Sequence, residues 1–180
     1  DDMLITGKRH NFYSDYEVGF NDKGIIEGVK IKLLSRCGIS PDLSGAINGR
    51  ALLHIDNAYY LSDVLVENYL CKTNTSSSTA FRGFGGNQGM MIIENIIDNV
   101  AKYLRKDSAE VRKLNFYQKN KKNTTHYGMK IKDNVINEIF NKLIKSSDYK
   151  KRRLKIKKFN LKNKYLKKGI AITPVKFGIS

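Results

Sequence analysis

The sequence predicts an α+β fold, because the spacing of its apolar residues changes from the period of a strand to that of a helix. Residues 15–20 alternate between polar and apolar side chains, 21–24 have the composition of a tight turn, and alternation resumes over 25–34. This pattern predicts an antiparallel β-hairpin. Residues 90–104 repeat apolar side chains at spacings of three and four, which indicates an amphipathic helix. The expected architecture is therefore a hairpin and short strands with several helices.

The stretch between the hairpin and the long helix is predicted to hold one further strand. Residues 37–49 are rich in glycine and serine and predict a loop, and 51–60 predict a short helical or extended stretch. Residues 64–72 have strand character. The second loop, 73–89, is the least ordinary segment, because its last seven residues include four of the chain's fourteen glycines.

Three shorter helices are predicted after the long one. Ser108 can cap a helix over 109–117, because its hydroxyl can accept a hydrogen bond from a backbone N–H of the first turn. Either Asp133 or Asn134 can cap the next helix, which carries an apolar stripe. A basic helix follows over 148–160.

Strand character returns at residues 169–172 and 175–179. No run of about 18 apolar residues predicts a membrane-spanning helix, and the first residues lack the basic-then-apolar order of a secretion signal. Cys37 and Cys71 are the two cysteines, and without a CxxC pair or a nearby histidine pair they are expected to be reduced, buried thiols. These features predict a cytoplasmic protein.

The formal net charge of +16 is concentrated in one basic stripe, residues 145–168. This stripe holds twelve Lys or Arg and one acid, Asp148, and so contributes +11. It could bind nucleic acid by releasing counterions from phosphates. The whole chain is also rich in Lys, Asn and Ile, which A/T-rich codons favour, so compositional drift with a solvated helix face is the preferred interpretation. No specific nucleic-acid partner is therefore expected.

The loop at residues 79–89, which we call the glycine loop, combines features that suit a flat, anionic ligand. Its glycines let the backbone approach a ligand, and its junction with a helix N-terminus favours an anion. Arg82 adds a cation with a planar set of donors, and Phe84, between two glycines, can offer an aromatic face. The loop lacks the Gly-Lys-Ser/Thr of a P-loop and the glycine spacing of a dinucleotide site. On these residues alone, a structural turn before a helix is an equal alternative.

Four blocks of sequence resemble one enzyme family and occur in that family's order. The first block lies around the glycine loop. Its residues Ser78–Gly86, Gln88 and Gly89 are very similar to the pterin-side loop of xanthine dehydrogenases, as is the preceding Cys71–Asn74. The other three blocks are Arg50–Tyr59, Glu110–Tyr117 and Thr173–Ser180. The chain therefore resembles the molybdopterin-binding (large) subunit of the xanthine dehydrogenase family, which includes xanthine oxidases and aldehyde oxidases. Residues 1–180 are expected to form a partial molybdopterin-binding domain, an internal fragment incomplete at both ends.

The resemblance implies a molybdenum hydroxylase, an oxidoreductase that converts hypoxanthine or xanthine to urate in purine catabolism. In that family, molybdenum held by molybdopterin carries a hydroxide, which a glutamate deprotonates for attack on the substrate. Electrons leave through 2Fe–2S clusters to FAD and then to NAD. The implied partners are a purine, the iron–sulfur and FAD domains or subunits, and a second copy in a dimer of the complete complex. The catalytic glutamate lies outside this chain, so the isolated chain is expected to be inactive.

The resemblance also assigns roles within the glycine loop. Arg82 matches an arginine that lies near the molybdenum without being a ligand of it, and Ala80, Phe81 and Gly83 form the same cofactor-binding wall. Phe84 matches an aromatic residue that stacks on the purine.

Arg50 matches an arginine that hydrogen-bonds a purine carbonyl and stabilises negative charge on the ring, which makes it the expected catalytic and substrate-binding residue. Aldehyde oxidases usually lack this arginine, so Arg50 favours a purine over the alternative, an aldehyde oxidase-type hydroxylase. A non-enzymatic basic nucleic-acid-binding fragment is the second alternative. Two residues depart from the family pattern. Asn87 replaces the usual proline, so slightly looser binding is expected there. Gly49 replaces an acid just before Arg50, a departure that bears on the orientation of Arg50.

Overall fold

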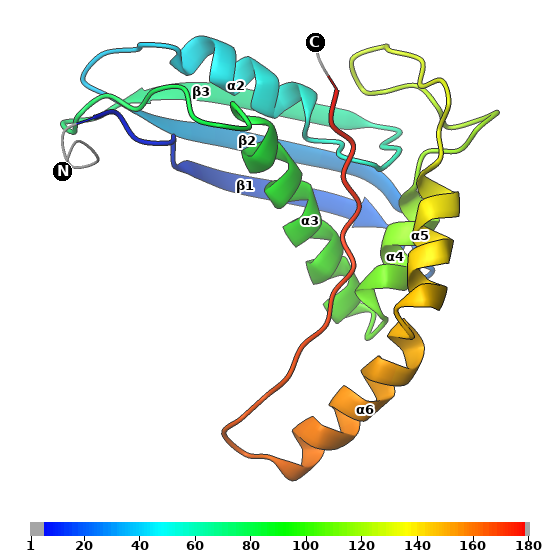
Figure 1. Ribbon diagram of the computed structural model, residues 1–180. Coiled ribbons are helices and arrows are strands. Elements are labelled where there is room, and N and C mark those ends of the chain that lie inside the picture. Colours follow the sequence, from blue (N-terminus) through cyan, green and yellow to red (C-terminus); the bar gives the residue numbers. More distant parts are fainter. Residues whose placement is uncertain (1–5, 179–180) are drawn as a thin grey trace.

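The computed structural model describes residues 6–178, which form a three-stranded sheet and five helices (Figure 1). The strands are β1 (Phe12–Phe20), β2 (Ile26–Gly38) and β3 (Val64–Lys72), in the spatial order β1-β2-β3. The helices are α2 (Ser44–Leu53), α3 (Gly86–Tyr103), α4 (Ser108–Asn115), α5 (Ile136–Ser146) and α6 (Tyr149–Lys162). The predicted α+β class is confirmed.

The β-hairpin forms where the alternation predicts it. β1 and β2 pair antiparallel. Asn21 closes the turn, because its side-chain oxygen accepts hydrogen bonds from the backbone N–H groups of Lys23 and Ile25. Every second residue in the middle of β2 is buried on the side of the helices: Val29, Ile31 and Leu33.

β3 joins β2 in the parallel direction, which the sequence pattern did not reveal. A parallel pair needs a crossover connection, and residues 39–63, which include α2, supply it. The predicted strand at 64–72 has the observed bounds, whereas the predicted loop at 37–49 is wrong in its second half, because α2 already begins at Ser44. Asn48 fastens α2 to β3, since its Nδ2 donates to Asn68 Oδ1 at 2.8 Å.

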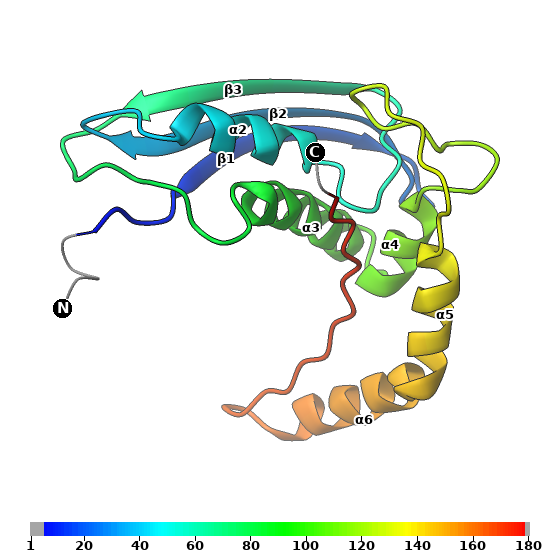
Figure 2. The ribbon, with the colours of Figure 1, turned by 45° about the horizontal axis from the view of Figure 1, so that its top comes forward.

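Helix α3 packs its apolar stripe on the sheet, as its spacing predicts. It shares one hydrophobic core with Ile31 and Leu33 of β2. In both Figure 1 and Figure 2, α2 and α3 lie on the same face of the sheet. The helix begins at Gly86, so the last residues of the glycine loop form its first turn. The buried residues of the stripe include Ile93, Ile96, Ile97 and Val100.

The caps of the shorter helices differ in part from the prediction. The N-cap of α4 is Asp107, whose side chain accepts a hydrogen bond from Ala109 N at 2.8 Å, so the predicted cap Ser108 is wrong by one residue. Neither cap predicted for α5 is its N-cap, which is Val135 and makes no side-chain cap hydrogen bond. Asn134, one residue earlier, accepts a hydrogen bond from Ile136 N through its Oδ1 at 3.1 Å. A carboxylate suits the first turn of a helix better than a hydroxyl, because it also interacts with the helix dipole.

The tail, residues 163–178, is extended but belongs to no sheet. The predicted strands at 169–172 and 175–179 are therefore wrong over the described part of the chain, and Ile179 lies outside it. Figures 1 and 2 show the tail returning from α6 past α3, where no strand edge is available. Side-chain hydrogen bonds hold the tail in place of strand pairing. The Asn57 side chain bonds the tail backbone at Pro174 and at Lys176.

The remaining expectations concern the cysteines and the membrane. Cys37 is a buried free thiol, as predicted, whereas Cys71 is half-buried rather than buried. Between residues 6 and 178, no helix is long and apolar enough to cross a membrane.

Two helical glycines predict opposite effects of the same substitution. A Cβ added at Gly89 would lie 2.3 Å from the carbonyl oxygen of Ala51, whereas one added at Gly49 would meet nothing within 4 Å. Gly89→Ala should therefore lower the free energy of unfolding by about 1–3 kcal/mol through overpacking. Gly49→Ala should raise it by about 0.5–1 kcal/mol, because glycine weakens a helix interior. Urea unfolding followed by circular dichroism measures both, and equal effects would contradict the close packing of α3 on α2.

Candidate functional site

The glycine loop enters α3 through three consecutive residues with left-handed backbone angles. The φ values are 92° at Gly83, 47° at Phe84 and 91° at Gly85. Glycine adopts such angles readily, whereas phenylalanine does so at a cost in free energy. A Cβ at Gly85 would lie 2.0 Å from the carbonyl oxygen of Ile47 in α2. The loop therefore needs glycine both for its turn and for its contact with α2.

Several backbone amides at the start of α3, where the sequence favours an anion, already have partners within the loop. The backbone N–H groups of Phe84, Gly86 and Gln88 each donate to the carbonyl oxygen three residues earlier, at 2.8, 2.9 and 3.1 Å. Amides that bond within the loop are not available to a ligand without rearrangement. The amides of Phe84, Gly86 and Gln88 therefore serve the turn of the loop.

Arg50, in the last turn of α2, is half-buried and contacts the tail. Its Nη2 donates to the carbonyl oxygen of Gly178 at 2.8 Å. Its guanidinium carbon lies 5.0 Å from the centroid of the Phe177 ring, within the range of a cation–π interaction. Two consecutive tail residues thus fix the orientation of this guanidinium.

The structure brings Arg50 and Phe84 onto segments that touch. A Cβ at Gly85, which follows Phe84, would lie 3.1 Å from the backbone nitrogen of Ala51, which follows Arg50. A Cβ at Gly86 would lie 3.2 Å from the Phe177 ring. Helix α2, the glycine loop and the tail therefore converge around Arg50, and Phe84 is half-buried at this convergence.

Arg82, Ala80 and Phe81 form the other half of the loop. Arg82 is exposed, and Phe81 is 50% exposed. Arg9 stacks on Phe81, with its guanidinium carbon 4.5 Å from the ring centroid, and its Nη2 donates to the Arg82 carbonyl oxygen at 2.7 Å. Arg9 therefore covers an exposed aromatic ring at this edge of the loop, and the exposed Arg82 is the next residue along the chain.

This half of the loop fits an anionic cofactor. Arg9 Nη1 is buried and has no hydrogen-bond partner among the described residues. A buried donor without an acceptor costs free energy, and an anionic group such as that of molybdopterin would supply the acceptor. Arg82 and Arg9 are the residues of this chain that would hold it. Over residues 6–178, no group of three His, Cys, Asp or Glu could hold a metal ion.

Burial lowers the pKa of all three histidines. His54 follows α2, and its Nδ1 lies 3.0 Å from the carbonyl oxygen of Arg50, so this nitrogen carries the proton and donates. The positive charges of Arg50 and Lys176 lower the pKa of His54 further. His54 is therefore neutral at pH 7, and its ring lies 5.3 Å from that of Phe177.

Asp56 is a fully buried carboxylate that ties the tail to the helical core. Its Oδ2 accepts hydrogen bonds from the Tyr117 hydroxyl, at 2.6 Å, and from the Lys176 ammonium. Burial, followed by the charge of Asp56, raises the pKa of Tyr117. Tyr117 is therefore a hydrogen-bond donor at any physiological pH.

A second buried ion pair joins α4 to α3. Arg112, 2% exposed, contacts Glu94 at 2.7 Å and Asp98 at 2.8 Å. Burial disfavours the charge of Arg112, but the hydrogen bond and charge of Glu94 outweigh it, so its pKa is raised. Tyr59 and Asn57 both donate to Glu94 Oε1, so this network extends to the residue after Asp56.

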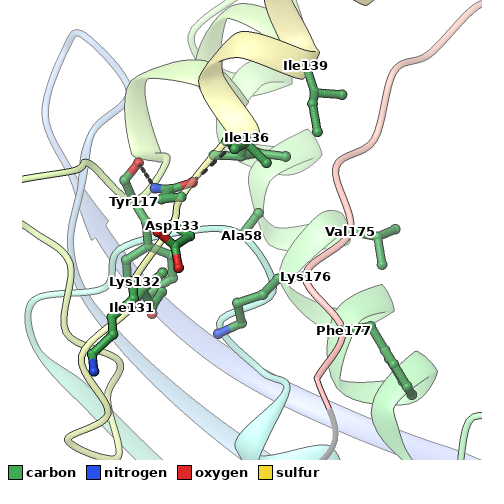
Figure 3. Close-up of a pocket in the computed structure, with 12 residues that line it drawn as sticks. Ala58, Tyr117, Ile131, Lys132, Asp133, Ile136, Ile139, Val175, Lys176 and Phe177 are labelled. Carbon is green, nitrogen blue, oxygen red and sulfur yellow. Dashed lines mark hydrogen bonds between the residues drawn. The ribbon is translucent and has the colours of Figure 1, made fainter.

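A pocket of about 350 Å³ lies between the tail and the start of α5 (Figure 3). Residues that line it include Ala58, Tyr117, Ile136, Val175 and Lys176, and none of the predicted site residues does. In Figure 3 the side chains of Lys176 and Phe177 leave the tail in different directions. Lys176 forms an ion pair with Asp56, and Phe177 contacts the Arg50 guanidinium, so the tail connects Asp56 with Arg50.

The basic stripe is largely a solvated surface, as the sequence indicated. Helix α6 extends away from the sheet in Figures 1 and 2, and most of its Lys and Arg side chains are exposed. Arg153 pairs with Asp107 at 2.8 Å. Burial, with a hydrogen bond to Asp107, raises the pKa of Tyr149 to about 12, so the base of α6 is anchored by a neutral tyrosine.

Five residues that lie in the tail, or that contact the tail or Phe81, were not predicted from the sequence as site residues. Asp56, Asn57, Lys176 and Phe177 lie within blocks that carry the family resemblance, but their pairing across about 120 positions is invisible in one sequence. Arg9 gave no signal beyond its charge.

Stability should fall on mild acidification, because the three histidines are neutral in the folded protein. Their pKa values are lowered from an ordinary 6.5, so the unfolded chain binds more protons below that pH. The histidine contribution is fully present above about pH 6.5 and is lost as the pH falls toward the lowered values. Thermal unfolding at pH 7.5, 6.5 and 5.5 should show a falling midpoint, with a smaller fall in His126→Gln. A midpoint that rises over this range would contradict it.

Comparison with known proteins identifies the family. A family model described as the molybdopterin cofactor-binding domain matches residues 1–116. The chain is 42% identical over 180 residues to a xanthine dehydrogenase/oxidase of Gallus gallus, and 40% identical over 179 residues to a xanthine dehydrogenase of Dictyostelium discoideum. These alignments cover 100% and 99% of this chain but 13% of each relative, so the chain spans a small part of their length.

Solved structures share the fold. The aldehyde oxidoreductase of Desulfovibrio desulfuricans matches with a TM-score of 0.74 at 25% identity, over 83% of this chain and 16% of that one. Reconstituted CO dehydrogenase from Oligotropha carboxidovorans also reaches 0.74, over 84% of this chain and 19% of that one, and at 19% identity it shows the fold alone. Together with the matched domain and the 40% and 42% identities, these findings place the chain in the molybdopterin cofactor-binding domain family of xanthine dehydrogenase-type molybdenum hydroxylases.

Proposed function

We propose that this chain is the part of a purine-oxidising molybdenum hydroxylase that contacts both the molybdopterin and the purine. The observation that supports it is the orientation of Arg50, whose guanidinium is held by Phe177 and Gly178 of the tail. The complete enzyme would oxidise hypoxanthine or xanthine to urate and would include the catalytic glutamate. The isolated 180 residues would then be inactive on their own.

Bound molybdopterin would supply the oxidation of an electron-poor ring carbon. Arg82 and Arg9 would bind the anionic part of the cofactor at the exposed edge of the loop. Phe84 would stack on the purine, and Arg50 would donate to a ring carbonyl and stabilise the negative charge that builds up there. A guanidinium held in place in advance does this without reorganisation, which is why its fixed orientation matters.

The proposal includes the partners and the place of the complete enzyme. Iron–sulfur clusters and FAD in other domains or subunits would take the electrons and pass them to NAD. The complex would be a cytoplasmic dimer with no membrane partner.

Replacement of Arg50 tests the purine assignment. In the complex purified through a tag on this polypeptide, Arg50→Met should lower kcat/KM for xanthine by about 10²–10³, the usual effect of removing one charge-stabilising donor. Arg152→Met, on the exposed face of α6, is the matched control and should leave turnover unchanged. Xanthine turnover that survives Arg50→Met, beside good turnover of an aldehyde, would favour an aldehyde oxidase-type hydroxylase instead.

The exposed α6 helix keeps nucleic-acid binding as a second candidate function. We expect weak binding to duplex DNA or RNA that disappears near physiological salt, because few phosphates are neutralised by a single helix face. Fluorescence anisotropy at 50 and 150 mM salt measures it, with Lys155→Glu and Lys158→Glu as variants. Tight binding with a steep salt dependence, lost in these variants, would support the nucleic-acid-binding candidate.

A further inference from the structure

The tail is held against the core by two neighbouring residues, Asp56 and Asn57. Asn57 acts as a backbone partner: its Nδ2 donates to the Pro174 carbonyl oxygen at 2.9 Å, and its Oδ1 accepts from Lys176 N at 3.0 Å. Asp56 binds the Lys176 ammonium. Three hydrogen bonds from two side chains therefore fix residues 174–176.

The residue types suit this role. Asn57 has a φ of 42°, and asparagine is one of the few residues other than glycine that adopts left-handed angles readily. Glycine would accept the angle but could not bond the tail. Asp56 is fully buried, and a buried carboxylate needs a charged or hydrogen-bonding partner, which Lys176 and Tyr117 supply.

The fixed segment continues directly into the contacts of Arg50. Phe177 and Gly178 follow Lys176. The Phe177 ring lies against the Arg50 guanidinium, and the Gly178 carbonyl oxygen accepts a hydrogen bond from Arg50 Nη2. An arginine side chain has several rotatable bonds, so its orientation depends on such contacts. If residues 174–176 were released, the contacts of Phe177 and Gly178 with Arg50 would be released with them.

The contacts of Asp56 and Asn57 with residues 174–176 form a clamp on the tail. No neighbouring charge competes with the ion pair of this clamp. Lys176 Nζ also lies 5.1 Å from the Tyr117 ring centroid and 5.8 Å from that of Tyr127. Burial and the nearby Lys176 lower the pKa of His126 and His54, so neither adds a third cation at neutral pH. Asp56 is therefore the carboxylate to which Lys176 is paired.

We propose that Asp56 and Asn57 are positioning residues for Arg50: by clamping the tail, they set the geometry in which Arg50 meets a purine carbonyl. This inference rests on the proposed function. It predicts a selective defect, because a substrate without a ring carbonyl does not need Arg50. Weakening the clamp should lower kcat for xanthine with little change in KM, since the lost interaction belongs to the charged transition state.

The test uses the complex purified through a tag on this polypeptide, with two variants that open the clamp from opposite sides. Asp56→Asn removes the buried charge at constant shape, and Lys176→Met removes its partner from the tail, so one variant remains if the other fails to fold. Lys176→Arg keeps the charge and should retain most activity. Glu138→Gln, which breaks the exposed pair with Lys142 in α5, is the control.

Hydrogen exchange by mass spectrometry should show faster exchange of the Lys176 amide in both clamp variants, by about 10-fold or more, and no change in the control. Turnover of xanthine should fall about 10- to 100-fold, the range expected for a misplaced catalytic group, while turnover of a simple aldehyde stays within twofold. Equal losses on both substrates would mean a merely structural role and would overturn the inference. Unchanged exchange and unchanged xanthine turnover would overturn it too.

Failure of the proposed function gives a different result. If the unaltered protein oxidises no purine, the proposed function fails, and the clamp is judged on exchange alone. Faster exchange at Lys176 in both variants then supports the clamp, and unchanged exchange refutes it.

Discussion

The close approach of α3 to α2 is the constraint on which the site depends. Gly85 and Gly89 face backbone carbonyl groups of α2 so closely that a single Cβ would collide with them. Because the glycine loop ends at this contact, its turn is fixed beside the last turn of α2, where Arg50 lies. Gly85 and Gly89 are thus needed for packing, and the backbone N–H groups of Phe84, Gly86 and Gln88 donate within the loop. In the proposed function, the side chains of Arg82, Arg9 and Phe84 are the groups that would bind ligands.

A series of buried hydrogen bonds and ion pairs connects helix α3 to the tail. Arg112 and Glu94 join α4 to α3, Asn57 connects Glu94 to the backbone of the tail, and Asp56 adds an ion pair with Lys176. Buried charges of this kind add little net stability, but breaking one partner of such a pair is strongly destabilising, so they specify a single arrangement. The tail makes no sheet contact and depends on these side chains for its path.

The two halves of the glycine loop differ in a way that matches two different ligands. The half with Arg9, Phe81 and Arg82 is exposed and cationic, with a buried donor that lacks an acceptor. The half with Phe84 is half-buried and adjoins Arg50, whose charge is held by an aromatic ring and a carbonyl group. An anionic cofactor suits the first environment, and a flat ring with a polar edge suits the second. Both environments belong to one loop, in which the left-handed Gly83 lies between Arg82 and Phe84.

The sequence by itself determined the elements whose signal is local. The hairpin and the long helix follow from periods of two and 3.6, the strand at 64–72 and the basic helix were predicted from residue composition, and the family blocks pointed to Arg50, Arg82 and Phe84. Tertiary structure decided the parallel pairing of β3, the non-strand path of the tail, and the contacts of Arg50 with Phe177 and Gly178. These depend on contacts between residues that are distant in the sequence, such as Val29 with Val64 and Arg50 with Gly178, and no local pattern records them. The strand-like residues 169–178 show the reason most clearly: an apolar alternation becomes a strand only where an unpaired edge is within reach, and here the tail lies beside a helix instead.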